Sequence, residues 1–245
     1  MTVKLTASAK LTLTLRITGV RPDGYHLIDA EMVSLALADT LTISPDADVM
    51  SCDGPFAHGT PVDSSNLVAR ALKLAGRSAG VHIHKAIPHG GGLGGGSSNA
   101  AAVLRWAGYS DIAGSAAIGA DVPFCLVGGR ARVRGIGELV EPLPFVAMKI
   151  TLVIPPIAIS TPAAYHAWDN MKIDEQTEPT TNDLEAAAIS VEPLLADWRE
   201  QIEKAAGERP TLAGSGATWF LRGHHKIAEA LPDALVVHTE TVPAT

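Results

Sequence analysis

The sequence predicts an α+β protein. Segments that alternate apolar and polar residues are typical of half-buried strands, and a glycine-rich run joins one such segment to a helical one. Strands and helices follow each other without the regular rhythm of a doubly wound sheet. The chain has 245 residues, 47% hydrophobic and 18% charged, as in folded globular proteins. This length allows two domains, and we expect them to span residues 1–147 and 148–245.

Charge and cysteine usage narrow the class of protein. The net charge is −7, which argues against the basic field of a nucleic-acid or membrane-surface binder. We therefore expect no nucleic-acid and no membrane partner. With only Cys52 and Cys125, no signal-peptide pattern and no apolar run of about 18 residues, the sequence favours a cytoplasmic protein with free thiols. We expect a monomer or a weak homodimer.

The first elements are strands. Residues 10–17 alternate strictly, with Leu11, Leu13, Leu15 and Ile17 on the core face and Lys10, Thr12, Thr14 and Arg16 on the other. Residues 21–25 have turn chemistry, because proline presets φ and glycine permits positive φ. Strands are predicted at residues 32–37 and 40–43, and a loop over residues 44–62.

The rest of the chain alternates helices and strands. Ser64-Ser65-Asn66 can cap a helix running to about residue 74. The further predictions are a strand at 81–85, a helix at about 98–106, a helix turn and hairpin within 122–143, a strand at 149–154, a loop at 169–185, a helix opened by Pro193 with Leu194, Leu195, Trp198 and Ile202 on one face, a glycine turn within 210–222 and a strand at 234–242.

The strongest functional signal is the glycine loop, residues 90–96, in which six of seven residues are glycine. Glycine costs backbone entropy, but it allows N–H groups to approach an anion closely, and the following helix adds its positive end. Packing does not explain such a run, so we expect a phosphate site rather than a flexible turn before a capped helix. The expected phosphate-binding residues are Pro88, Gly90, Gly91, Gly92, Leu93, Gly94, Gly95, Gly96, Ser97, Ser98 and Asn99.

Other phosphate loops fit less well. A Walker loop would end in Gly-Lys-Ser/Thr, whereas Gly96 is followed by two serines. Gly90-x-Gly92-x-x-Gly95 formally matches a dinucleotide fingerprint, but the βαβ context is missing.

Two further segments carry candidate chemistry. A second glycine turn, residues 213–218, contains two hydroxyl side chains and is either an ordinary turn or a second wall of the pocket. Asp121 is an acid in an apolar stretch, and it is either a helix cap or a general base at a pocket edge. The remaining histidines form no convincing metal set, and we assign no metal ligand.

These segments occur in the order of a known superfamily. The motifs are Ala9-Lys10-Leu11, Asp23-Gly24-Tyr25-His26, the glycine loop with Ser97-Ser98-Asn99, residues 119–124 and residues 213–218. Together they resemble the galactokinase, homoserine kinase, mevalonate kinase and phosphomevalonate kinase family. Asp-Gly-Tyr-His is more specific and resembles the members that act on a cytidyl-linked methylerythritol.

The resemblance implies a two-domain kinase. Its N-terminal domain would resemble the second domain of ribosomal protein S5, and its C-terminal domain would be ferredoxin-like. ATP with Mg²⁺ and a cytidyl substrate would meet between them. By the same resemblance Asp121 is the catalytic base and Lys10 its partner, Asn66 lies near the adenine, and the substrate residues are Thr12, Tyr25, His26, Tyr165, Gly214, Ser215 and Gly216.

Three departures from the family pattern leave alternatives open. Thr12 stands where the family has asparagine, His89 stands where an apolar residue is common, and residues 100–119 are several residues short. A sister kinase for another alcohol and a nucleotide-binding paralogue without turnover remain the alternatives.

Overall fold

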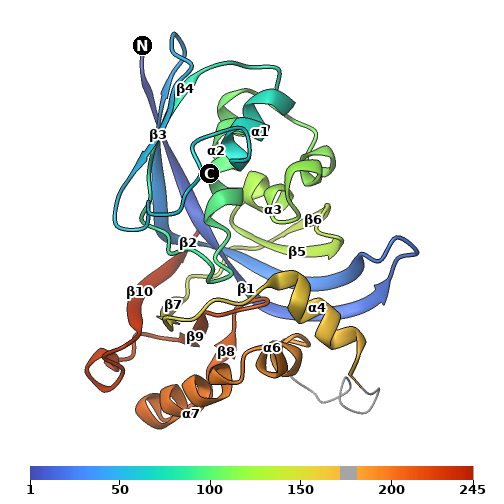
Figure 1. The fold of residues 1–245 in the computed structure, drawn as a ribbon, viewed down its shortest axis with the longest axis vertical. Helices are drawn as coiled ribbons and strands as arrows, with labels where there is room; N and C mark the ends of the chain where they lie inside the picture. The colour runs from blue at the N-terminus through green and yellow to red at the C-terminus, as the bar shows by residue number, and fades with distance from the viewer. Residues whose placement is uncertain (172–180, 245) are drawn as a thin grey trace.

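The computed structural model describes residues 1–171 and 181–244, and over these residues the chain is α+β, as predicted. The elements are β1 (Val3–Val20), β2 (His26–Ser44), β3 (Met50–Asp53), α1 (Leu67–Leu74), β4 (Gly80–His84), α2 (Gly95–Trp106), η1 (Ala113–Ile118), α3 (Val122–Val127), β5 (Arg130–Gly135), β6 (Leu139–Leu143), β7 (Lys149–Ile154), α4 (Thr161–Asp169), α6 (Glu185–Val191), α7 (Leu194–Ala206), β8 (Thr211–Leu212), β9 (Trp219–Arg222), η2 (Ala228–Ala230) and β10 (Leu235–Val242). In Figure 1 the β1–β2 hairpin crosses the molecule, with α1, α2 and α3 above and α4, α6 and α7 below.

The β1–β2 hairpin is longer than the sequence predicted. β1 is a single strand of 18 residues, and β2 joins the two short strands expected at 32–37 and 40–43. The register shifts between Ser8 and Lys10 and again between Thr12 and Thr14. Both faces of this stretch are covered, so Lys10 and Thr12 are buried together with the predicted leucines. Periodicity alone could not show this, because it assumes one solvated face.

Two other predictions, both for the N-terminal half, need correction. Residues 44–62 are not all loop, because β3 pairs in parallel with β4. Such a short strand forms only where an existing sheet edge offers partners. The helix expected from residue 98 begins at Gly95, since Gly94 takes a left-handed conformation (φ 66°) and ends the loop there. The cap of α1 is confirmed: the Asn66 side chain accepts from the Val68 N–H at 2.8 Å.

The C-terminal half forms a smaller antiparallel sheet that continues the larger one. β7 pairs with β9 and β10, and β10 ends by pairing with β2 at Thr241–Leu35 and Val242–Ser34. One apolar cluster joins Leu11 and Leu35 to Ile150, across the expected boundary at residue 147. The division into two domains at that residue stays a prediction.

The helices of this half differ in detail from the sequence prediction. α4 reaches Asp169 and α6 begins at Glu185, inside the span predicted as loop, of which residues 172–180 lie outside the described residues. In α7, Leu195 and Ile202 are buried as predicted, but Leu194, at the edge of that face, is exposed.

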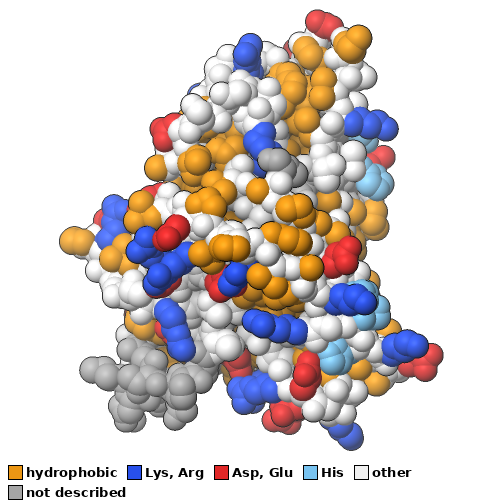
Figure 2. All heavy atoms as spheres, turned by 180° about the vertical axis from the view of Figure 1, so that it is seen from behind, with side chains coloured by type: hydrophobic (Ala, Val, Ile, Leu, Met, Phe, Trp, Pro, Cys, Tyr) orange, Lys and Arg blue, Asp and Glu red, His pale blue; other side chains and the backbone are white. Residues whose placement is uncertain are grey.

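The surface carries mixed charge. On the face opposite that of Figure 1, basic and acidic side chains are interspersed with hydrophobic ones (Figure 2). Arginines of β5 form cross-strand ion pairs, Arg130 with Glu31 at 2.7 Å and Arg132 with Asp29, and the Arg132 guanidinium lowers the pKa of Asp29. In the part of the chain that the structure describes, no helix is long and apolar enough to cross a membrane.

Candidate active site

The glycine loop lies on the second glycine turn. The Ala217 N–H donates to the Gly90 carbonyl at 3.4 Å. A Cβ atom on Gly92, whose φ is +73°, would lie 2.5 Å from the Ala213 carbonyl oxygen. Close backbone packing therefore requires glycine here. The expectation that packing does not explain the run was wrong for this position, because Ala213, against which Gly92 packs, lies 121 positions further along the chain and leaves no local pattern.

Lys10 runs directly beneath the same loop. Its N–H donates to the Leu93 carbonyl at 2.9 Å, and a Cβ on Gly94 would lie 2.6 Å from Lys10 Cγ. Gly94 thus leaves room for the aliphatic stem of the lysine. The loop and β1 hold each other, which fixes where the ammonium group emerges.

This packing predicts unequal effects of two glycine substitutions. Gly94→Ala adds a methyl group against Lys10 at a positive φ, and we expect it to lower the free energy of unfolding by about 1–3 kcal/mol. Gly96→Ala lies within α2, with only Leu67 Cδ1 at 3.5 Å, and is expected to leave stability equal or slightly higher. Urea denaturation of both variants measures the difference. Equal stabilities would contradict the proposed packing role of Gly94.

Lys10 and Asp121 meet as predicted by resemblance. Lys10 Nζ lies 3.3 Å from Asp121 Oδ2 and 3.2 Å from Thr12 Oγ1. Asp121 occupies the N-cap position of α3, but its side chain makes no capping hydrogen bond. Its side chain is 32% exposed, whereas that of Lys10 is 7% exposed. The carboxylate is therefore turned to the lysine and to solvent rather than used as a cap.

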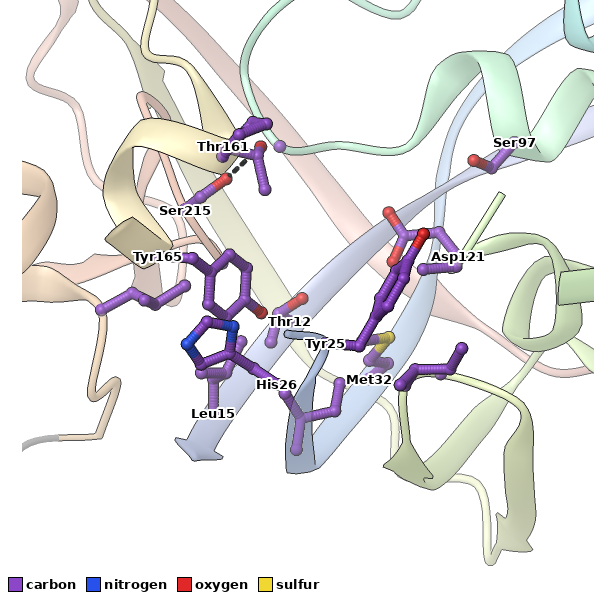
Figure 3. Close-up of a pocket in the computed structure, with 18 of the residues that line it drawn as sticks. Thr12, Leu15, Tyr25, His26, Met32, Ser97, Asp121, Thr161, Tyr165 and Ser215 are labelled. Atoms are coloured by element: carbon purple, nitrogen blue, oxygen red, sulfur yellow. Dashed lines mark hydrogen bonds between the residues drawn. The ribbon is translucent and has the colours of Figure 1, made fainter. Parts of the chain in front are cut away.

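These groups line a cleft of about 590 Å³ (Figure 3). Its walls include β1, β2, the start of α2, the segment before α3, the β5–β6 turn, α4 and the second glycine turn. The predicted site residues that line it are Lys10, Thr12, Tyr25, His26, Gly92, Ser97, Asp121, Tyr165, Gly214 and Ser215. On the Tyr165 side of the cleft, Ser215 Oγ and Thr161 Oγ1 are 2.7 Å apart.

The aromatic residues occupy opposite walls. Figure 3 shows Tyr25 beside Asp121 and Tyr165 across the cleft, next to His26. Tyr25 is 60% exposed, whereas the Tyr165 ring centroid lies 4.6 Å from that of His26. Tyr165 lies in α4, which Ser160 caps. Burial, with a smaller effect from Asp121, raises the pKa of Tyr165 to about 12, so its phenol stays protonated at neutral pH.

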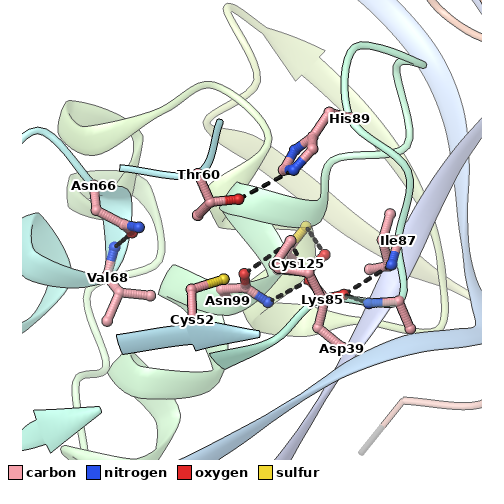
Figure 4. A network of polar contacts seen from close by, with 12 residues as sticks. Asp39, Cys52, Thr60, Asn66, Val68, Lys85, Ile87, His89, Asn99 and Cys125 are labelled. Atoms are coloured by element: carbon pink, nitrogen blue, oxygen red, sulfur yellow. Dashed lines mark hydrogen bonds and ion pairs between the residues drawn. The ribbon is translucent and has the colours of Figure 1, made fainter. Parts of the chain in front are cut away.

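Three residues predicted to bind ATP, Ser98 and Asn99 at the phosphates and Asn66 near the adenine, have side chains that contact the protein instead. Ser98 Oγ lies 3.4 Å from the buried Cys125 Sγ, whose pKa burial raises to about 12. The Asn99 side chain is buried and joins a polar network (Figure 4). Both polar atoms of the Asn66 side chain are used, because Nδ2 also donates to the Pro61 carbonyl at 2.6 Å. A ligand role for these three side chains stays a prediction.

The buried network is the feature that the sequence analysis missed. Asp39 and Lys85 form a buried ion pair, and Asp39 also accepts from the Ala86 and Ile87 N–H groups at 2.7 and 2.8 Å. Asn99 donates to Asp39 at 2.9 Å and accepts from Lys85 at 3.1 Å. The network ties β2 to the segment before the glycine loop and to α2. The available signal was an acid within an apolar strand pattern.

Curated proteins of similar sequence carry the same enzyme name. A 4-diphosphocytidyl-2-C-methyl-D-erythritol kinase of Paracoccus denitrificans is 41% identical over 231 residues, covering 87% of this chain and 84% of the relative. One from Ruegeria pomeroyi is 37% identical, covering 90% and 88%. The GHMP kinases N terminal domain matches residues 66–129.

The chain belongs to the 4-diphosphocytidyl-2-C-methyl-D-erythritol kinase family.

Solved structures agree with this membership of the 4-diphosphocytidyl-2-C-methyl-D-erythritol kinase family. A crystal structure of 4-(cytidine 5'-diphospho)-2C-methyl-D-erythritol kinase superposes with a TM-score of 0.77 and 30% identity, covering 98% of this chain and all of the other. A homoserine kinase from Cytophaga hutchinsonii, 14% identical, has a TM-score of 0.66 over 99% and 95% of the two chains and shares the fold. The protein is an α+β kinase, as predicted.

Two residues that depart from the family pattern make polar contacts within the protein. Thr12, which is buried, accepts a hydrogen bond from Lys10 Nζ and so helps to hold the ammonium group near Asp121. His89 Nε2 lies 3.1 Å from Thr60 Oγ1 and ties the glycine loop to the segment before α1 (Figure 4). Each substitution therefore keeps a polar contact within the protein.

Proposed function

We propose that this protein transfers the γ-phosphoryl group of ATP to the 2-hydroxyl of 4-diphosphocytidyl-2-C-methyl-D-erythritol, a step in non-mevalonate isoprenoid synthesis. The names of its relatives and the order of its motifs support this assignment. The observation that carries it is the Lys10–Asp121 contact at 3.3 Å, at the place where the glycine loop meets the cleft.

The chemistry assigned to this pair is proton transfer with charge neutralisation. As the hydroxyl oxygen forms its bond to the γ-phosphorus, the bond to the leaving ADP oxygen breaks, and Asp121 accepts the hydroxyl proton. The Lys10 ammonium, fixed by Thr12 and by the loop, faces the charge of the transferring group. Lys10 lies in β1 and Asp121 at the N-cap of α3, so their separation is set by the fold before substrate binds.

The glycine loop and the first turn of α2 are assigned to the triphosphate. The N–H groups at the start of α2 have no helical partners, and the helix dipole favours an anion there. Ser97 is the hydroxyl of this turn that lines the cleft.

The cleft offers oxygen ligands for Mg²⁺ beside the glycine loop. Mg²⁺ in kinase sites usually takes one or two protein oxygens together with phosphate oxygens and water. The Asp121 carboxylate and the Ser97 hydroxyl both line the cleft, and in the described residues no cluster of three or more His, Cys, Asp or Glu side chains offers a separate metal cage. The ion would neutralise phosphate charge when bound with ATP.

The part of the cleft between Tyr25 on one wall and Tyr165 on the other is assigned to the cytidyl group. Tyr25, His26 and Tyr165 line it, and aromatic faces favour stacking with a base. Tyr25 is exposed in the free protein, so we propose that the base enters between Tyr25 and Tyr165 and covers both rings.

The test is ADP release by the purified protein with ATP, Mg²⁺ and one alcohol at a time. We expect turnover with 4-diphosphocytidyl-2-C-methyl-D-erythritol and at least a hundredfold lower kcat/KM with homoserine, mevalonate or galactose. These three alcohols carry no base to stack between Tyr25 and Tyr165. Faster turnover of another alcohol would make this a sister kinase. ATP binding without turnover of any of them would support a nucleotide-binding protein.

A further inference from the structure

His26 has one ring nitrogen engaged by the protein. His26 Nε2 lies 2.6 Å from Asp169 Oδ1, and its side chain is 10% exposed. Nδ1 has no hydrogen-bond partner among residues 1–171 and 181–244. Both residues line the cleft. The two ring nitrogens therefore have different surroundings.

One helix, α4, supplies two ring contacts and a hydrogen bond to this imidazole. Tyr165, Trp168 and Asp169 are spaced three and four residues apart on α4, so they share one face of the helix. The Tyr165 ring lies 4.6 Å from the His26 ring, and the Trp168 ring meets it edge-on at 5.7 Å. Two rings thus fix the plane of the imidazole, while the carboxylate meets one nitrogen. A rotated ring would lose both the ring contacts and the hydrogen bond.

A carboxylate only accepts hydrogen bonds, so its partner nitrogen must carry a proton. In the neutral imidazole, which carries one N–H proton, that proton is then on Nε2, and Nδ1 is a hydrogen-bond acceptor. An acceptor pairs with an amino group and is repelled by a carbonyl oxygen. Cytosine and uracil differ in this way, because cytosine bears an exocyclic amino group where uracil bears a carbonyl.

We propose that Asp169 is a positioning residue that selects the Nε2–H tautomer of His26, and that the kinase thereby prefers a cytidyl over a uridyl substrate. The base preference rests on the proposed function, whereas the tautomer does not. Asp169 does not touch the reacting atoms and acts through His26. No motif in the sequence marked it.

The tautomer is tested on the free protein. The ¹⁵N shifts and long-range couplings of the imidazoles are measured at about pH 8, where an ordinary histidine is neutral. His26→Gln identifies the signals among the nine histidines. We expect Nε2–H in the wild type and a mixture of tautomers in Asp169→Asn, because an amide both donates and accepts. An Nδ1–H ring in the wild type, or an unchanged ring in the variant, overturns the proposal whatever the protein phosphorylates.

The base preference is tested by steady-state kinetics with the cytidyl substrate and its uridyl analogue. Asp169→Asn is expected to raise KM for the cytidyl substrate about tenfold and to lower the cytidyl-to-uridyl ratio of kcat/KM by a similar factor, with KM for ATP unchanged. Asp197→Asn, an exposed acid of α7 outside the cleft, is the matched control and is expected to behave as wild type. A general fall in kcat with an unchanged ratio would show a merely structural role and overturn the preference.

The two proposals fail in different ways. If the wild type does not phosphorylate the cytidyl substrate, the proposed function fails, and the tautomer measurement still decides the role of Asp169. If it does, but Asp169→Asn keeps the wild-type base ratio, only the inference about Asp169 fails.

Discussion

Asp121→Asn is expected to lower kcat by about a hundredfold to ten-thousandfold, because an amide cannot accept the proton of the attacking hydroxyl. The side chain is isosteric and makes no capping hydrogen bond in α3, so the fold and KM for ATP should change little. Steady-state ADP release together with thermal unfolding measures both quantities.

A second variant checks whether Asp121 and Lys10 act as a unit. Lys10→Met removes the ammonium that lies 3.3 Å from the carboxylate. We expect the double variant to lose little more activity than the worse single variant, since paired catalytic groups are not additive. Near wild-type turnover of Asp121→Asn would exclude Asp121 as the base while leaving the kinase assignment intact.

The largest effect on stability is expected at the buried ion pair. Asp39→Ala leaves the Lys85 ammonium, itself buried, without its carboxylate and leaves two N–H groups without an acceptor. Removing one partner of such a pair costs about 3–5 kcal/mol. Urea denaturation followed by circular dichroism gives the free energy of unfolding directly.

The matched control is an exposed pair in the same protein. Glu141→Ala removes the partner of Arg134 on β5, at 3.2 Å between two half-exposed side chains, and should cost no more than about 1 kcal/mol. Asp39→Ala combined with Lys85→Met removes both charges and is expected to recover part of the loss. A cost of less than about 1 kcal/mol for Asp39→Ala alone would contradict the structural role of the network.

The parts of the site that could be predicted from sequence have local signatures. The glycine loop is a continuous run, and Asp121 is an isolated acid in an apolar segment. Lys10 required the resemblance, because a lysine on an alternating strand is ordinarily solvated. In the structure Lys10 is buried under the loop, and Gly94 leaves the space for it.

The Asp39–Lys85 pair shows why other parts could not be predicted. The two residues are 46 positions apart and meet because β2 and β4 pair antiparallel with Thr40 opposite His84. That register is set by packing of the whole sheet and leaves no local pattern. Asp169 was missed for the same reason, since its partner His26 lies 143 positions away.

The sequence by itself predicted the kind of chemistry: a backbone cradle for phosphate, a lysine and an acid, and aromatic residues for a base. Only the tertiary structure decided which polar side chains are available to a ligand. Ser97, Ser98 and Asn99 are adjacent in the chain, yet Ser97 lines the cleft while the other two are buried. Successive helical residues point about 100° apart, so the orientation of α2 against the sheet sends neighbouring side chains to the cleft or to the core.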